Sequence, residues 1–464
     1  MNLKFNPLFL VLLLAGISVS HQSPAQQLTR KVTENLLATV DPSSMVNNSF
    51  SFSNDMRRIA YSIRSGNKQI MVINGRNGKA FDSVTAPVFS PDSKRFAYAS
   101  RNGSNWFLIL DDKQEIRLDS DSSIKVILFS PDSKNITYVV RTPYNLYTVF
   151  NTEKGKPYES INENSIIFSP DSRKIAYSAG KNKKQCLVFD GQEGPLYDQV
   201  GFPVLSSDGK RLAYWAVDSS RTFVIVDNKK SKPFEAVGTI LFSRDGKHCA
   251  FNAVRDKKHL VILDSTESEK YDQVHSLCFN ADGSRMAYGI ELAPGDKNGF
   301  KDYAVSDGKM TGPYETVVEG SFKFSPDGKS LAYKSEREDA FFMVVNGKEG
   351  KRYSDVLQGT FVYSPDNLRF AFVAEDNSKR MVSADNVEGA PFNDIFSIIF
   401  SPDSKRFACA VQLDNKEFVV IDGKKGKPYD TIMSLGEIIF DSADTFHYIT
   451  MKGNNIFLVE EKLE

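Results

Sequence analysis

The sequence predicts an all-β protein made of about eleven copies of one four-stranded unit, and three observations support this. First, the phrase Phe-Ser-Pro-Asp-Ser-Lys-Arg-Phe-Ala-Tyr at residues 89–98 recurs with variations. Second, its serine position returns every 37 to 45 residues, a period typical of solenoids and propellers. Third, aromatic residues make up 12% of the chain, as expected where side chains pack on pleated sheets. The serine positions are Ser53, Ser90, Ser130, Ser169, Ser206, Ser243, Asn280, Ser325, Ser364 and Ser401.

The phrase itself predicts the first strand and the turn that follows it. A large apolar residue precedes the serine in every copy, which indicates the end of a short buried strand. An aspartate follows two residues after the serine in all ten copies, usually between Pro and Ser or Gly. We expect a tight turn whose carboxylate accepts a backbone N–H two residues further on. These aspartates are Asp55, Asp92, Asp132, Asp171, Asp208, Asp245, Asp282, Asp327, Asp366 and Asp403.

Three further strands follow each turn. Large residues alternate with a small one, as in Phe96, Ala97 and Tyr98, which is typical of a strand packed on both faces. A third strand ends in Asn-Gly or Asp-Gly, the strongest short signal for a hairpin. The fourth strand contains a proline such as Pro428, which is tolerated where one edge of a strand is unpaired.

Four antiparallel strands in about 38 residues, repeated without helices, are typical of a β-propeller blade. The phrase at residues 324–333 resembles the WD-like propeller repeats of the Pro-Asp type, the TolB-like family. The resemblance covers about residues 40–460. Asn280 with Ala281 departs from it, as does a degenerate eleventh copy after Phe440. The resemblance implies a periplasmic or cell-surface setting and partner binding around a ring opening, but the chain carries no motif for a particular partner.

Eleven copies exceed the 4 to 8 blades usual for one ring. We therefore expect two rings of five or six blades, divided near residues 235–280, with one unusually large ring as the alternative. The last copy ends with a third strand at residues 456–459, and residues 37–40 precede the first blade without a partner. We predict that the amino-terminal segment supplies the missing outer strand of the last blade.

The ends and the charge of the chain predict an exported protein. Residues 1–25 have the layout of a cleaved signal peptide, with a cut after Ala25 or Ser20, and the array occupies residues 26–464. No cysteine lies near the cut, so we expect no lipid anchor, and no later apolar stretch is long enough to insert in a membrane. Lys plus Arg and Asp plus Glu number 58 each, so nucleic-acid binding is not expected. The predicted location is periplasmic or extracellular.

Enzyme signatures are largely missing, so we assign no catalytic residue, no cofactor and no metal site. The chain has no G-x-S-x-G, G-x-G-x-x-G or G-K-[ST] motif. Of its five histidines, one lies near the predicted signal cut and four are isolated along the array, and the turn aspartates occur in every copy, which favours a structural role. The four cysteines fall inside predicted strands and fit no metal-ligand spacing, so we expect them to pack as small hydrophobic residues.

The leading functional hypothesis is a non-enzymatic scaffold that binds an envelope or extracellular protein, or an envelope polymer, through its variable loops. The alternative is a lyase or hydrolase with its site in the central channel. The seventh copy carries the longest insertion, at residues 291–301. Aromatic residues often anchor interfaces. The candidate partner-binding residues are Trp106, Tyr144, Asp296, Lys297 and Phe300. No feature of the sequence specifies an oligomeric state.

Overall fold

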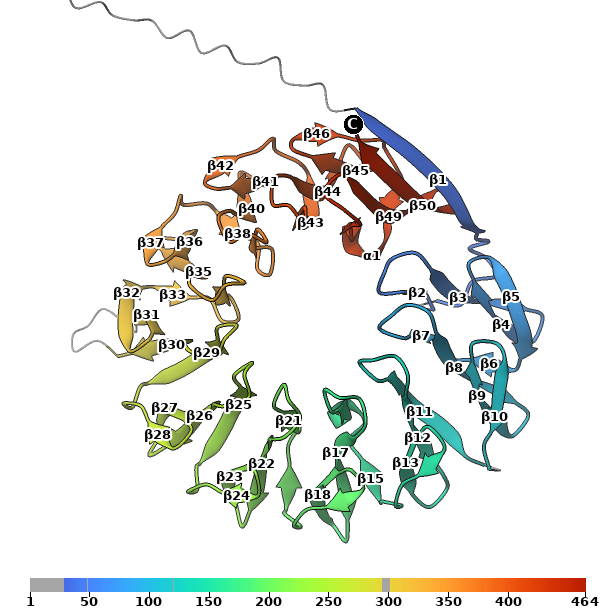
Figure 1. The fold of residues 1–464 in the computed structure, drawn as a ribbon, viewed down its shortest axis with the longest axis horizontal. Helices are drawn as coiled ribbons and strands as arrows, with labels where there is room; N and C mark the ends of the chain where they lie inside the picture. Colours follow the sequence, from blue (N-terminus) through green and yellow to red (C-terminus); the bar gives the residue numbers. More distant parts are fainter. Residues whose placement is uncertain (1–28, 48, 120, 294–300) are drawn as a thin grey trace, which may run out of the picture.

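The computed structural model describes residues 29–47, 49–119, 121–293 and 301–464. These residues form eleven antiparallel sheets, arranged as blades around one axis in a single ring (Figure 1). The predicted all-β propeller of about eleven blades is therefore confirmed. Blades are numbered along the chain, and each has its first strand nearest the axis and its fourth strand at the periphery.

The first strand of several blades is divided into two short pieces that pair with the same second strand. From blade 1 to blade 11 the first strands are β2 (Ser51–Phe52), β6 (Ser83–Val84) with β7 (Val88–Phe89), β11 (Ser123–Phe129), β15 (Ser160–Ile161) with β16 (Ile167–Phe168), β20 (Gln199–Val200) with β21 (Val204–Leu205), β25 (Ala236–Phe242), β29 (Gln273–Phe279), β33 (Thr316–Val317) with β34 (Lys323–Phe324), β38 (Asp355–Val356) with β39 (Val362–Tyr363), β43 (Asp394–Phe400), and β47 (Thr431–Ile432) with β48 (Ile439–Phe440).

The second and third strands form the centre of each blade. In the same order the second strands are β3 (Ile59–Ser65), β8 (Phe96–Asn102), β12 (Ile136–Arg141), β17 (Ile175–Lys181), β22 (Leu212–Asp218), β26 (Cys249–Arg255), β30 (Met286–Leu292), β35 (Leu331–Arg337), β40 (Phe370–Asp376), β44 (Phe407–Leu413) and β49 (Thr445–Lys452). The third strands are β4 (Lys68–Ile73), β9 (Asn105–Leu110), β13 (Leu146–Phe150), β18 (Lys184–Phe189), β23 (Arg221–Val226), β27 (Lys258–Leu263), β31 (Lys301–Ser306), β36 (Ala340–Val345), β41 (Lys379–Ala384), β45 (Lys416–Ile421) and β50 (Asn455–Leu463).

The fourth strands are mostly short, except in the last blade. They are β5 (Arg76–Phe81), β10 (Gln114–Arg117), β14 (Glu153–Lys154), β19 (Gln192–Glu193), β24 (Lys229–Lys230), β28 (Thr266–Glu267), β32 (Lys309–Tyr314), β37 (Lys348–Glu349), β42 (Val387–Glu388), β46 (Lys424–Lys425) and β1 (Arg30–Thr39). Two short helical segments complete the described fold, a 3-10 turn η1 (Glu163–Ser165) and α1 (Met433–Gly436).

The expectation of two rings of five or six blades is wrong. Residues 235–280, where a division was expected, form an ordinary junction between blades 6 and 7. Val261 of β27 packs in one cluster with Val274 and Ile290 of blade 7, and the Asn252 side-chain N–H₂ donates to the Val274 carbonyl at 3.4 Å. Because the blades within the array have their own outer strands, none of them offers the open edge that a second closing strand would need.

The repeated phrase forms the predicted turn. In blade 2 the Ser90 hydroxyl donates to Asp92 Oδ1 at 2.6 Å, and the same oxygen accepts the Lys94 backbone N–H at 3.1 Å. The prediction that the aspartate accepts an N–H two residues on is therefore confirmed. The Asp92 backbone N–H in turn donates to Ser133 Oγ of blade 3 at 2.9 Å. The turn thus fixes its own shape and also holds the next blade.

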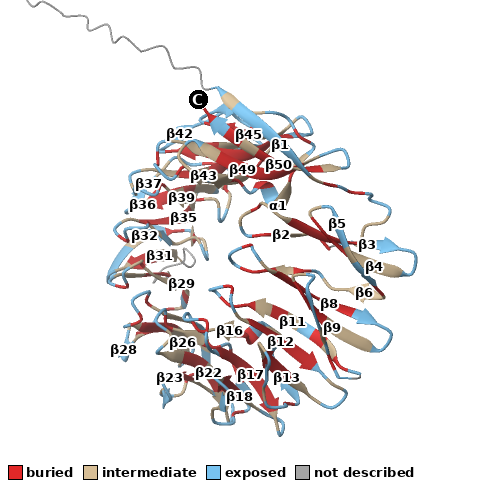
Figure 2. Cartoon of the chain, turned by 45° about the vertical axis from the view of Figure 1, so that its right-hand side comes forward, coloured by how far each residue is buried: buried red, intermediate tan, exposed pale blue. Residues whose placement is uncertain are grey.

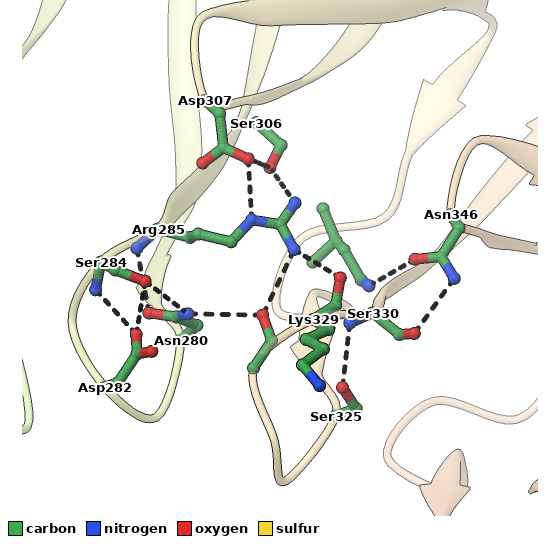
Figure 3. A network of polar contacts seen from close by, with 12 residues as sticks. Asn280, Asp282, Ser284, Arg285, Ser306, Asp307, Ser325, Lys329, Ser330 and Asn346 are labelled. Atoms are coloured by element: carbon green, nitrogen blue, oxygen red, sulfur yellow. Dashed lines mark hydrogen bonds and ion pairs between the residues drawn. The ribbon is translucent and has the colours of Figure 1, made fainter. Parts of the chain in front are cut away.

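An arginine strengthens several junctions at the same level, as Figure 3 shows for blades 7 and 8. Arg285 donates through Nε to Asp307 of its own blade at 2.8 Å. Its Nη1 donates to the carbonyls of Gly328 and Lys329 in blade 8, at 3.2 and 2.5 Å, and the guanidinium lies over the Phe324 ring. Arg58, Arg95, Arg211 and Arg369 make matching contacts with the blades that follow them.

The two ends of the chain meet in blade 11. β1 pairs antiparallel with β50 from Arg30 opposite Leu463 to Thr39 opposite Asn455. The prediction that the amino-terminal segment supplies the outer strand of the last blade is therefore confirmed. Ala38 and Val40 also join a core cluster that contains Ile59 of blade 1 and Ile449 of blade 11. One strand consequently completes the last sheet and bridges the closing junction of the ring.

Buried residues concentrate along the centres of the strands, and exposed residues lie in the turns and outer edges (Figure 2). Cys186, Cys249 and Cys409 are buried, Cys278 is half-buried, and all four are free thiols, as predicted. Burial raises the pKa of Cys249, Cys278 and Cys409 to about 12. Among the described residues, no helix is both long and apolar enough to span a membrane.

Candidate functional site

The ring has two faces with different loops. Because strands alternate in direction, the Ser-Pro-Asp turns and the hairpins from third to fourth strand lie on one face, which we call the turn face. The connections from second to third strand, and from each blade to the next, lie on the opposite face, the loop face. The turn face repeats the same contacts in most blades. Differences between blades therefore concentrate on the loop face and along the inner strands.

Most loop-face hairpins are closed by two residues with positive φ, as at Asn182 and Lys183 or Ser219 and Ser220. This is the type I′ geometry that suits the twist of a hairpin. Blade 3 differs, because four residues, 142–145, join β12 to β13. Within this loop Thr142 Oγ1 accepts the Tyr144 backbone N–H at 3.2 Å, and the Tyr144 side chain is 92% exposed. Tyr144 is thus held out at the tip of an ordered loop.

The other predicted partner-binding residues lie elsewhere. Trp106 is half-buried on β9 and packs against the core cluster shared by blades 2 and 3. Asp296, Lys297 and Phe300 lie outside the described residues; the described ends of their insertion are Leu292 and Lys301, which pair directly in blade 7. The structure therefore places Trp106 and Tyr144 in neighbouring blades, whereas the insertion belongs to a blade four positions further along the ring.

Blade 7 also carries a polar cluster on its inner strand. The ring of His275 lies over Gly289 of β30, where a Cβ atom would come within 2.1 Å of His275 Cε1. His275 Nδ1 is 3.0 Å from the hydroxyl of Ser276, and Nε2 is 3.9 Å from Asp302 Oδ2. The Ser276 hydroxyl also accepts the Gly320 backbone N–H of blade 8 at 2.8 Å. A histidine, a serine and an aspartate thus meet at the junction of blades 7 and 8.

The surroundings of this cluster favour its neutral forms. Burial lowers the pKa of His275, and burial also raises the pKa of Asp302. Glu291, beside Asp302 on the neighbouring strand, has its pKa raised by burial and by the negative charges of Asp302 and Asp272. Asp302 Oδ2 accepts the Val317 backbone N–H at 2.8 Å, a position that Gln69 and Gln185 fill at other junctions. Asp302 therefore also clamps blade 8.

This arrangement can present a neutral imidazole as a proton acceptor beside a hydroxyl group. The distance of 3.9 Å between Nε2 and Asp302 is too long for a hydrogen bond, so the carboxylate does not orient the ring directly. Within the described ranges, no three side chains of His, Cys, Asp and Glu are grouped so as to hold a metal ion.

The sequence interpretation missed this cluster because it treated His275 as one of several isolated strand histidines. The available signal was internal. At the position nine residues after the serine, four successive blades carry residue types that occur there in no other copy. These residues are Trp215, Asn252, Gly289 and Lys334, compared with Ser62, Ala99, Val139, Ser178, Val373 and Ala410. That comparison marks blades 5 to 8 as the unusual part of the inner wall.

No protein-family description and no curated protein sequence matches the chain. Among solved structures, it is similar to a eukaryotic initiation factor, with 14% identity and a TM-score of 0.42 over 80% of this chain and 98% of that one. It is also similar to TolB from Acinetobacter baumannii, with 15% identity and a TM-score of 0.26 over 55% of this chain and 75% of that one. A third similar structure is the propeller domain of the trilobed protease from Pyrococcus furiosus, with 13% identity and a TM-score of 0.30 over 67% of this chain and 98% of that one. These likenesses extend to the propeller fold and to no function.

Proposed function

We propose that the protein is an exported, non-enzymatic propeller that binds an envelope or extracellular protein, or an envelope polymer, through its loop face. The observation that supports this most is the difference between the two faces. Turn-face residues are engaged in contacts between blades, whereas Tyr144 extends from the loop face with 92% of its surface exposed. An exposed aromatic side chain on an ordered loop loses little conformational freedom on binding, which favours its use as an interface anchor.

The export part of the proposal is supported by the position of the first described strand. The first strand starts at Arg30, so cleavage after either Ser20 or Ala25 leaves β1 intact. Mass spectrometry of the protein recovered from the envelope fraction tests this directly. We expect an amino terminus at His21 or Gln26. Recovery of the uncleaved chain from the cytoplasm would contradict export.

Affinity capture with matched variants tests the binding proposal. Tyr144→Ala removes the exposed loop-face ring, and a second variant replaces residues 293–300 by Asn-Ser, the two-residue turn at residues 377–378 of blade 9. Leu368→Ala is the control, because Leu368 is 83% exposed but belongs to a Ser-Pro-Asp turn. Loss of an interface anchor costs about 2 kcal/mol or more, a decrease of about 30-fold in affinity.

We expect at least one loop-face variant to lose the partner that wild type captures, and Leu368→Ala to keep it. Equal capture by all four proteins, or loss in Leu368→Ala alone, would contradict binding through the loop face. Circular dichroism of each variant establishes that it remains folded.

A second candidate function, a hydrolase, is favoured by the hydrogen bond between His275 and Ser276. Hydrolysis of p-nitrophenyl acetate by the purified protein tests it. For this candidate to hold, Ser276→Ala and His275→Ala must abolish the hydrolysis, while His248→Ala on the turn face retains it. Absence of hydrolysis by the wild-type protein would exclude this candidate for simple esters.

A further inference from the structure

Blade 8 places two lysines at positions where its sister blades carry other kinds of residue. Lys323 stands two residues before the repeat serine, on the innermost strand β34. Its counterparts are uncharged, and most of them are apolar: Ser51, Val88, Leu128, Ile167, Val204, Leu241, Cys278, Val362 and Ile399. Lys334 stands nine residues after the serine, on β35. No requirement of the blade fold explains two ammonium groups here, since the other blades form without them.

Both lysines line a cavity of about 190 Å³ between blades 8 and 9. Its walls include the apolar side chains of Phe322 and Met343 from blade 8 and of Val356 and Phe361 from blade 9. An engineered cavity of about 150 Å³ in another protein accepts benzene, so this volume suits a ligand of about six to nine non-hydrogen atoms.

The two ammonium groups differ in how they are compensated. Lys334 is buried, its Nζ lies 2.5 Å from Asp355 Oδ1, and it also lies over the Phe341 ring. Lys323 is exposed as a whole residue, but its ammonium is partly desolvated, and Nζ donates to the Phe361 carbonyl at 2.9 Å. Among the described residues, no carboxylate oxygen lies within 4.0 Å of the Lys323 Nζ. An ammonium has three donors, so two remain for a ligand.

We propose that this cavity binds a small monocarboxylate with an apolar body, its carboxylate on Lys323 and its body between Phe322 and Phe361. One uncompensated ammonium matches one negative charge. Apolar walls favour a hydrocarbon body and disfavour a phosphate, whose oxygens need several donors each. Desolvation lowers the pKa of the Lys323 ammonium, and a bound carboxylate would offset that loss of solvation. This site is independent of the loop-face proposal.

Calorimetric titration of the full mature protein at pH 7 tests the proposal with three probes: benzoate, benzyl alcohol and inorganic phosphate. Lys323→Val is the main variant, because valine occupies this position in blades 2, 5 and 9, as Val88, Val204 and Val362. Lys329→Val is the matched control, since the Lys329 side chain is 85% exposed on the turn face of the same blade.

We expect saturable benzoate binding to wild type and to Lys329→Val, and at least a tenfold weaker affinity in Lys323→Val. Benzyl alcohol and phosphate should bind at least tenfold more weakly than benzoate. The melting temperature of Lys323→Val should equal or exceed that of wild type, which separates loss of binding from loss of fold. No benzoate binding by wild type, unchanged binding in Lys323→Val, or equal binding of phosphate and benzoate would overturn the proposal.

Discussion

At the junction of blades 7 and 8, Arg285 of the earlier blade reaches forward to carbonyls of the later one (Figure 3). At the seam between blades 11 and 1 the direction is reversed. Arg57 of blade 1 reaches back to Asp441 and Glu460 of blade 11, at 3.0 and 2.6 Å. His447 of blade 11 lies 2.7 Å through Nε2 from the Asp55 carbonyl. The seam thus joins two similar sheets with side chains that the repeat does not supply.

Ring closure also uses a buried ion pair that the amino-terminal strand forms inside blade 11, on the side that faces blade 10. Arg30 Nε donates to Glu461 at 2.6 Å, and the Glu461 side chain is fully buried. Arg30 continues to the carbonyls of Val419 and Lys424 in blade 10. Interior junctions therefore use the same kinds of contact again and again along the chain, whereas closure of the ring depends on residues that occur once. Those residues therefore specify where the ring ends.

Removing the strand that closes the ring should cause the largest loss of stability. Deletion of residues 28–45 removes β1 with its ladder to β50 and leaves Glu461 buried without Arg30. We expect a loss of more than about 5 kcal/mol in the free energy of unfolding, because an unpaired buried charge alone costs about 3–5 kcal/mol. Thermal and urea unfolding followed by circular dichroism measure it. An unchanged melting temperature would show that β1 does not hold the seam.

Glu461→Gln isolates the buried pair between the amino-terminal strand and β50. The amide keeps the shape of the side chain but leaves the Arg30 guanidinium without a counter-charge, so we expect a loss of about 3 kcal/mol. Glu460→Gln, whose carboxylate pairs with Arg57 at the surface, should cost at most about 1 kcal/mol. Urea unfolding of both variants measures the difference. Equal losses would mean that burial of the pair does not matter.

Arg285→Ala tests an interior junction in the same way. The variant loses hydrogen bonds to Gly328 and Lys329 carbonyls and the contact with the Phe324 ring, all near the surface. We expect a loss of about 1–2 kcal/mol, smaller than that of Glu461→Gln. Lys329→Ala keeps the accepting carbonyl and should change stability by less than about 0.5 kcal/mol. A loss in Arg285→Ala as large as in Glu461→Gln would remove the distinction between the residues that close the ring and those of an interior junction.

Acid should weaken the interior turns. The loss of stability from any one turn should be smaller than the losses expected for the variants above. Hydrogen bonds from Ser243 and Lys247 lower the pKa of Asp245 from 3.8 to about 2, and most other turn aspartates shift in the same direction. Because the folded state holds these protons less tightly, their stabilisation is complete above pH 3.8 and is lost as the pH falls towards 2. Urea midpoints between pH 6 and 2 measure this. Asp245→Asn should flatten the decrease, and an identical slope would contradict it.

The repeated parts of the fold could be predicted from the sequence because each copy carries the residue pattern of its own strands and turns. Asp92 binds the Lys94 N–H as expected, and β1 completes the last blade. The single ring could not be predicted. The number of blades that close one ring depends on the angle between neighbouring blades. Small packing differences at each of the eleven junctions set this angle, and no single residue encodes it. His447 was a signal for the seam that the sequence analysis did not use, since its register position beside Phe446 holds Ala97 in blade 2.

The candidate sites were less accessible to sequence analysis. Tyr144 could be named because it is an aromatic residue near the variable loops. The cavity at Lys323 could not be named, because its walls come from two blades and its meaning depends on which carboxylates are near. Only the spatial neighbours show that Lys334 is compensated by Asp355.

The pairing of the two ends has a consequence for the connectivity of the chain. Thr29 and Glu464 exchange backbone hydrogen bonds of 3.2 and 3.0 Å, so the first and the last described residues lie side by side at the rim of blade 11. A short linker could therefore join them, and new termini could be opened at a two-residue loop-face turn such as Ser219 and Ser220. The resulting circular permutant would keep every blade and move the break from an outer strand to a hairpin. The order in which the blades are synthesised is thus separable from the order in which they stand in the ring.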